Sequence, residues 1–166
     1  MALDDKGGIE MSGNALTDLK VIVFQLKDEE YGIPVQQVHS IERMMHVTRV
    51  PKVAKFVKGV MNLRGVVTPI IDLRRRFGIE AVEYTESTRI IIVGVSDMEV
   101  GLIVDAANDV IDIPEDAIEP PPEVVGTVEV EYLNGVAKLD KRLLILLNLE
   151  KVLISDGLKD YKLIEG

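Results

Sequence analysis

Short runs of aliphatic and β-branched residues, each bounded by charged or glycine-containing turns, recur along the whole chain. Runs of this length and composition are typical of β-strands. They predict strands over residues 21–26, 31–33, 41–50, 56–63, 66–71, 89–95, 99–104, 108–113, 128–132, 136–139 and 143–147. The dipeptide Asn134-Gly135 is predicted to form the turn of a hairpin, because these two residues favour the positive φ angles of a tight turn.

The pattern of strands and turns repeats once along the chain. The aligned pairs are 22–26 with 91–95, 30–35 with 99–104, 63–66 with 133–136, and 70–73 with 146–149. The offset is 69 residues at the start and 76 at the end, so the second copy carries about six extra residues. Two similar β-rich halves indicate a docking scaffold more than a catalyst.

Both halves also end alike. Asp72 and Asn148 are placed to cap short helices, predicted at 73–77 and 149–153, by accepting backbone N–H bonds. Each half is too small for a large core of its own, and sheets of this size tend to close into barrels. The sequence therefore predicts a mainly β fold: two small barrels of about five strands each, packed on a shared hydrophobic core, with a few short helices.

The expected domain organisation has three parts. Residues 1–18 are polar and are predicted to be a flexible tail, and residues 155–166 form a second tail. The folded domain spans 19–154, with one lobe at roughly 19–80 and the other at 88–154. The sequence leaves open whether the two lobes exchange strands.

Composition narrows the possible chemistry. Hydrophobic residues make up 47% of the chain, which supports a folded core, but it has only three Phe, four Tyr and no Trp. The absence of cysteine excludes disulfides, thiolate metal sites and thiol nucleophiles. No apolar run is long enough to span a membrane.

Charge is distributed unevenly along the chain. The net charge is −9, yet residues 42–76 hold nine basic and two acidic residues, so this segment carries +7 and the remainder −16. A charge run of this kind is either a solvated face or a basic docking surface that steers an acidic partner.

No catalytic, cofactor or metal site is predicted. The only histidines, His39 and His46, are interpreted as ordinary surface or satisfied side chains. There is no glycine-rich phosphate loop, and the spacing of Asp105, Asp109 and Asp112 lacks the central glycine and terminal glutamate of a calcium loop. We therefore expect a protein that is not an enzyme and that needs no cofactor.

Two segments are candidates for binding. At the predicted turn 62–65, Arg64 aligns with Asn134 of the second half. A charged residue in one of two otherwise similar turns indicates a binding role, since the arginine head suits carbonyls or carboxylates of a partner. The alternative is that Asn62 and Gly65 only build the turn and Arg64 pairs with a nearby carboxylate. In the second segment, 36–43, Val38 and Ile41 are either core residues or an exposed apolar ridge for a partner.

These segments resemble the bacterial chemotaxis coupling proteins of the CheW family. The ordered matches lie at 31–41, 47–51, 56–65, 101–105, 118–120, 131–135 and 144–151, and the element Asn62-Leu63-Arg64-Gly65 is the most specific of them. The resemblance covers about residues 18–154 and implies two five-stranded SH3-like barrels around a shared core. It also implies a non-catalytic adaptor that binds the regulatory domain of the histidine kinase CheA and the cytoplasmic tips of methyl-accepting chemoreceptors.

Residue roles follow from the resemblance position by position. It implies kinase contacts at Val38, Ser40 and Ile41. It implies receptor contacts at Asn62, Leu63, Arg64, Gly65, Gly101, Val104 and Asp105. The implied location is the cytoplasm, at membrane-associated receptor arrays, without nucleic acid as a partner and without direct insertion into the membrane.

Two other functions are weighed against the adaptor. A nucleic-acid-binding double barrel could use the basic segment 42–76, but the net charge of −9 and the few aromatic residues argue against it. A small enzyme would need an acid–base pair drawn from Asp, Glu or Lys alone, and nothing in the sequence singles one out.

Overall fold

The computed structural model describes residues 18–122 and 128–154. Apart from Asp18, the two predicted tails lie outside the described residues.

The first sheet has the order β8 (Ala106–Ile113), β1 (Leu19–Leu26), β2 (Glu29–Pro34), β11 (Arg142–Leu147), β10 (Leu133–Leu139) and β9 (Ile118–Glu119). The second has the order β3 (Val38–Arg43), β6 (Arg89–Val95), β7 (Met98–Val104), β5 (Val66–Asp72) and β4 (Val57–Leu63). The mainly β fold class is confirmed, and the first sheet has six strands because the two-residue β9 joins its edge.

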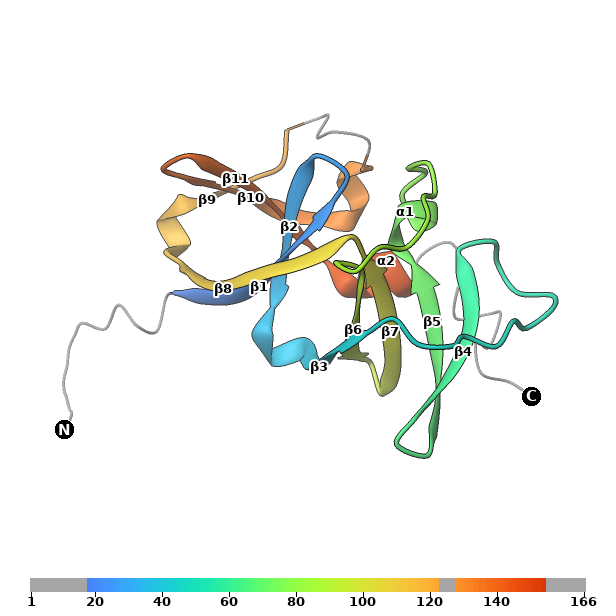
Figure 1. The fold of residues 1–166 in the computed structure, drawn as a ribbon. Helices are drawn as coiled ribbons and strands as arrows, with labels where there is room; N and C mark the ends of the chain where they lie inside the picture. The colour runs from blue at the N-terminus through green and yellow to red at the C-terminus, as the bar shows by residue number, and fades with distance from the viewer. Residues whose placement is uncertain (1–17, 123–127, 155–166) are drawn as a thin grey trace, which may run out of the picture.

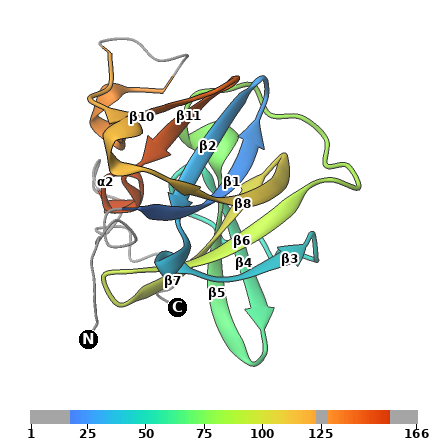
Figure 2. The same ribbon diagram turned by 90° about the vertical axis from the view of Figure 1, so that its left-hand side faces the viewer.

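Each sheet takes strands from both sequence repeats. The β1–β2 hairpin of the first repeat joins strands β8 to β11 of the second, and β2 pairs in parallel with β11. In the same way, the β6–β7 hairpin of the second repeat joins β3, β4 and β5 of the first, and β7 pairs in parallel with β5. Figures 1 and 2 show the two sheets as neighbouring bodies, with the chain crossing from one to the other after β2 and after β7. The lobe boundaries expected from the sequence remain a prediction.

Both sheets close into barrels in the same way: the chain that leaves one edge strand pairs with the strand at the opposite edge. In the second sheet, β3 lies at one edge and β4 at the other, and the chain that leaves β3 bridges to β4 through Thr48 and Val60. The backbone N–H groups of these two residues donate to each other's carbonyls, both at 2.8 Å. In the first sheet, the chain runs from edge strand β8 through the short helix η3 (Glu115–Ala117) to β9 at the opposite edge. Closure of this kind removes exposed strand edges.

Closure depends on glycine at two equivalent positions, Gly59 in β4 and Gly135 in β10. Both lie at irregularities in strand register, with φ of +152° and +158°. A Cβ on Gly59 would overlap the carbonyl oxygen of Thr48, and one on Gly135 would lie 2.6 Å from the carbonyl oxygen of Glu119. Glycine is therefore required here both for its backbone conformation and for the close approach of the closing strand.

This geometry corrects three local predictions. Asn134-Gly135 lies inside β10 rather than at a turn, because Gly135 serves the closure, and the β10–β11 turn falls at 140–141 instead. The predicted strand 128–132 is mostly the short helix η4 (Val130–Tyr132). The predicted strand 41–50 ends at Arg43, and of its remainder only Thr48 pairs.

The predicted caps are confirmed. Asp72 accepts a hydrogen bond from the backbone N–H of Arg74 at 3.0 Å and begins α1 (Leu73–Arg76). Asn148 accepts one from the backbone N–H of Lys151 at 3.2 Å and begins α2 (Leu149–Ile154). The short helix η2 (Val35–Gln37) carries the chain from β2 to β3.

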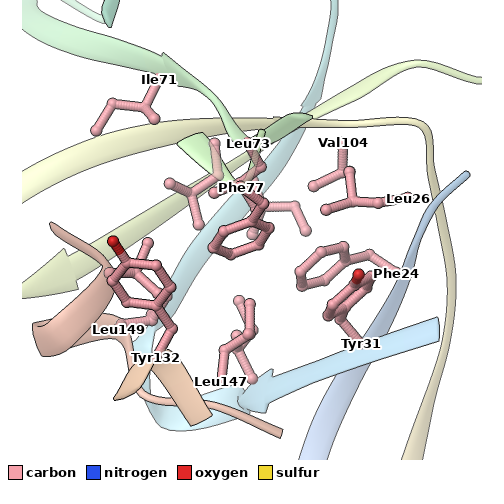
Figure 3. Packing of buried hydrophobic residues seen from close by; sticks show 14 of the residues in the cluster. Phe24, Leu26, Tyr31, Ile71, Leu73, Phe77, Val104, Tyr132, Leu147 and Leu149 are labelled. Carbon is pink, nitrogen blue, oxygen red and sulfur yellow. The ribbon is translucent and has the colours of Figure 1, made fainter. Parts of the chain in front are cut away.

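One hydrophobic core lies between the two sheets and draws on both. A row of aromatic rings crosses it: Phe24 and Tyr31 of the first sheet lie 5.6 Å apart, and Phe77, which follows α1, lies 6.1 Å from Tyr31. Tyr132 continues the row at 5.8 Å from Phe77 (Figure 3). Ring pairs at these distances add to the burial of apolar surface. The prediction of a shared core is confirmed.

The closure account predicts unequal effects of two glycine substitutions. Gly59→Ala is expected to lower the free energy of unfolding by about 3 kcal/mol or more, because backbone strain and steric overlap act together. Gly78→Ala is the control: its φ is +76°, but no atom of the described residues lies within 4 Å of an added Cβ. It should lose only about 1 kcal/mol. Urea unfolding measures both, and equal losses would contradict the steric part of the account.

Candidate functional site

The β4–β5 turn, at Arg64 and Gly65, is the centre of the first candidate surface. Both residues have positive φ, +52° and +85°, and the Asn62 side chain accepts a hydrogen bond from the backbone N–H of Gly65 at 2.9 Å. Asn62 and Gly65 therefore build the turn, as one interpretation of the sequence held. The Arg64 side chain is 67% exposed and takes no part in the turn's own hydrogen bonds. Figure 1 shows this hairpin extending beyond the other strands of its sheet.

Arg64 reaches across the closure to β3. One guanidinium nitrogen lies 3.4 Å from Glu42 Oε2, and the other lies 3.5 Å from Ser40 Oγ. Long, exposed contacts of this kind contribute little to stability. They leave the guanidinium able to exchange these contacts for a partner's carboxylates or carbonyls. We call Ser40, Glu42, Asn62, Arg64 and Gly65 the Arg64 cluster.

Two exposed valines extend the Arg64 cluster along β5. Val66 is 52% exposed and Val67 is 55% exposed. The sequence did not indicate them as binding residues, because they begin a hydrophobic run that looked like a buried strand. Their structural counterpart in the first sheet is the start of β11, where Leu143 is 52% exposed. The two turns are therefore related by the 76-residue offset and not by the 70-residue one. Applied to Val66 and Val67, this offset leads to the start of β11, so it could have indicated that both hairpins expose apolar side chains after their turns.

A second candidate surface is an apolar groove between the two sheets. Ile41 of β3 faces β8 across a cavity of about 200 Å³, lined by Ile22, Ile41, Ala107, Asn108, Asp109 and Val110. Ile41 is 41% exposed and Val110 is 53% exposed. We call this cavity the intersheet groove.

The two alternatives for segment 36–43 each hold for one residue. Val38 is half-buried and packs against the shared core, whereas Ile41 is exposed in the intersheet groove. The pleat of β3 produces this split, since successive side chains point to opposite faces of a strand. β3 thus contributes Ser40 and Glu42 to the Arg64 cluster and Ile41 to the intersheet groove.

Asp105 ties the two sheets together at the point where the chain leaves β7 for β8. Its carboxylate accepts two hydrogen bonds from Arg74, at 2.8 and 2.6 Å, and one from the backbone N–H of Lys27 at 2.8 Å. Burial raises the pKa of the Asp105 carboxyl, but the hydrogen bonds from Arg74 and Lys27 outweigh burial, so the pKa lies below its ordinary value. The geometry of Asp105 is that of a structural link.

The remaining residues in the expected receptor set are buried. Val104 is 1% exposed and lies in the shared core (Figure 3). An added Cβ on Gly101 would lie 2.6 Å from an Ile70 methyl group, and Leu63 is 6% exposed. A partner would therefore contact the residues around these three positions rather than their own side chains. Their assignment to receptor binding stays a prediction.

The basic segment 42–76 does not form one surface. Arg74 is engaged by Asp105, and the buried Arg76 lies with its guanidinium over the rings of Phe56 and Tyr132, at 4.6 and 4.8 Å. Arg76 also donates a hydrogen bond to the Val152 carbonyl at 2.7 Å. The charges of Arg74 and Arg76 therefore make contacts within the protein and are not part of a basic docking surface.

Neither a metal site nor a membrane-crossing helix is found in the described ranges. No group of three or more His, Asp or Glu side chains within 18–122 and 128–154 is arranged to hold a metal ion. Within the same ranges, no helix is long and apolar enough to cross a membrane.

Comparison with known proteins gives consistent matches. Residues 20–156 match the family model described as the CheW-like domain. The chain is 46% identical over 143 residues to the chemotaxis protein CheW of Bacillus subtilis (strain 168), an alignment that covers 86% of this chain and 92% of that protein. It is 42% identical over 135 residues to the chemotaxis protein CheW of Klebsiella aerogenes, covering 81% of each. The crystal structure of the scaffolding protein TtCheW from Thermoanaerobacter tengcongensis superposes with a TM-score of 0.78 at 38% identity, covering 84% of this chain and 94% of that one.

The Asp105 link predicts a pH dependence of stability. A carboxyl whose pKa is lower in the folded state stabilises the fold above its unfolded pKa, near 4, and this contribution is lost as the pH falls through the folded pKa. Asp105→Asn should lower the free energy of unfolding at neutral pH by about 1–2 kcal/mol. It should also flatten the decline in stability below about pH 5 relative to the unchanged chain.

Asp112→Asn is the matched control for Asp105→Asn, because Asp112 forms an exposed ion pair with Lys20 at 3.6 Å. Urea unfolding across the acid range should leave this variant close to the unchanged chain. An Asp105→Asn variant that unfolds like the control at every pH would show that the link does not stabilise the fold.

Proposed function

The chain belongs to the CheW-like domain family, and from this membership we propose that it is a chemotaxis coupling protein that joins chemoreceptors to their histidine kinase. The family resemblance seen in the sequence is confirmed, and so is the prediction of a scaffolding protein rather than an enzyme. Membership also places its partners among the components of chemotaxis signalling complexes. The observation that supports the proposal is that one strand, β3, supplies side chains to two separate candidate surfaces.

The Arg64 cluster is proposed to bind the regulatory domain of the kinase CheA. The family resemblance implied a kinase contact for Ser40 and a receptor contact for Arg64, but the guanidinium of Arg64 lies 3.5 Å from Ser40 Oγ, which favours one partner for both. Arg64 supplies the planar donor head, and Val66 and Val67 expose apolar area at the same end of the hairpin.

The intersheet groove is proposed to receive the helical cytoplasmic tip of a chemoreceptor. A helix docks by laying its apolar face into a hydrophobic groove. Val110 and Ile41 provide apolar side chains for such a groove at the junction of the sheets, so this proposal moves Ile41 from the kinase surface implied by the resemblance to the receptor surface. Val104 and Asp105 come directly before β8, whose residues 107–110 line the groove, and Asp105 holds the chain there through its hydrogen bonds with Lys27 and Arg74. This supporting position gives the segment 101–105 a part in receptor binding without exposing its side chains.

This function places the protein in the cytoplasm, at the receptor tips, with no direct insertion into the membrane. Holding receptor and kinase together allows the receptor's conformation to bias kinase activity. The alternative of a nucleic-acid-binding barrel is weakened, because Arg74 and Arg76 of the basic segment are engaged inside the protein and the chain as a whole carries −9.

Reversing the charge at Arg64 tests the kinase surface. Arg64→Asp should weaken binding of the isolated kinase regulatory domain by about tenfold or more, since a central arginine removed from an interface costs well over 1 kcal/mol. Lys20→Asp is the control, because Lys20 is similarly exposed and also holds a single carboxylate, Asp112. Calorimetric titration measures the affinity, and thermal unfolding should show both variants folded. Equal affinity for the Arg64 variant and the unchanged chain would remove Arg64 from the interface.

A charge placed in the intersheet groove tests the receptor surface. Val110→Asp should weaken binding of a receptor signalling-tip fragment by about tenfold or more, because a carboxylate would have to be desolvated against an apolar helix face. Val82→Asp is the control, since Val82 is 50% exposed and outside the groove. The Val110 variant should still bind the kinase domain normally. A receptor affinity unaffected by Val110→Asp would exclude the groove.

A further inference from the structure

A second cavity, of about 400 Å³, lies where the loop between β3 and β4 packs near α1. Its basic side chains come from the loop, from the first residues of β4 and from the helix: Arg49, Lys52, Lys55, Lys58 and Arg75. The rest of its lining is mainly apolar: Val50, Pro51, Val53, Ala54 and Val57. We call this cavity the basic pocket.

The charges of the basic pocket are poorly compensated. Within residues 18–122 and 128–154, no carboxylate lies within ion-pair distance of Arg49, Lys52 or Lys55. Arg75 has only a long contact, its Nε lying 3.8 Å from Asp72 Oδ2. Lys58 lies over the ring of Tyr84, with its ammonium nitrogen 5.4 Å from the ring centre. Five like charges around one cavity repel one another, and a bound anion would relieve that repulsion.

The shape and surroundings of the basic pocket favour a compact anion over an extended one. Its volume falls within the range of small-molecule sites. The segment that supplies these cations carries +7, whereas the rest of the chain carries −16. A long polyanion or a broad acidic protein face would bring its other charges against that acidic remainder. Arginine forks and lysine ammonium groups together are the usual partners of phosphate oxygens.

We propose that the basic pocket binds a compact, phosphate-bearing anion with three or more negative charges, of the polyphosphate class. This site goes beyond the proposed coupling function and is separate from the Arg64 cluster. The basic pocket lies at the start of β4 and Arg64 just beyond its end, so the length of the strand, about 20 Å, separates them (Figure 1). Binding in the pocket therefore leaves the proposed kinase surface free.

The test is calorimetric titration of the full chain with tripolyphosphate at low and high salt. One-to-one binding that weakens with salt is expected. The double variant Lys52→Gln/Lys55→Gln should lose about tenfold or more in affinity, because it removes two charges that the anion would contact. Lys138→Gln is the control, since Lys138 is 65% exposed on the other sheet and pairs with Glu119. It should bind tripolyphosphate within about twofold of the unchanged chain.

Two further arms identify the anion. If vesicles containing phosphatidylinositol 4,5-bisphosphate, whose headgroup carries at least three negative charges, co-sediment with the protein and tripolyphosphate competes, the phosphate belongs to a lipid headgroup; without co-sedimentation it belongs to a soluble molecule. Both results retain the site. The proposal is overturned if tripolyphosphate does not saturate, if the double variant and the Lys138 control lose affinity equally, or if a hexaglutamate peptide binds as tightly as tripolyphosphate.

Discussion

The hydrophobic core between the two sheets is the interaction on which the rest of the molecule depends. Because β1–β2 and β6–β7 each pair with strands of the other repeat, neither sheet is complete without chain from both halves. The row of rings from Phe24 to Tyr132 crosses this core, and Asp105 fastens one of the two places where the chain changes sheets. The relative position of the sheets is therefore fixed by covalent connection, ring packing and a charged link together.

That fixed position creates the two proposed docking surfaces. The intersheet groove exists only where edge strand β3 of one sheet meets edge strand β8 of the other. The Arg64 cluster exists only because the second sheet closes, which brings the β4–β5 turn within reach of β3. Since β3 takes part in both surfaces, two partners bound as proposed would lie a short distance apart, in a constant relative orientation.

Local features of the fold could be predicted from the sequence, and long-range ones could not. Hairpins, the Asp72 and Asn148 caps and the need for a shared core follow from alternation, capping chemistry and small size. Which hairpin joins which sheet depends on pairings between strands that are far apart in the sequence. Local sequence patterns contain no information about these pairings. The hairpin turn predicted at Asn134-Gly135 is wrong for a related reason. Gly135 is needed for the close approach of the Glu119 carbonyl of β9, not for a turn. At the Arg64 cluster, the family resemblance named every residue except Glu42, but only the folded geometry placed Ser40 and Glu42 against Arg64.

The central claim is that this chain holds kinase and receptor at the same time, on separate surfaces. The most direct measurement is sedimentation of the protein mixed with the CheA regulatory domain and a receptor signalling-tip fragment. The account predicts a ternary species that contains all three components, in which saturating receptor fragment does not release the kinase domain. Two binary complexes that exclude each other would contradict it, because partners that compete cannot be coupled by the chain that binds them.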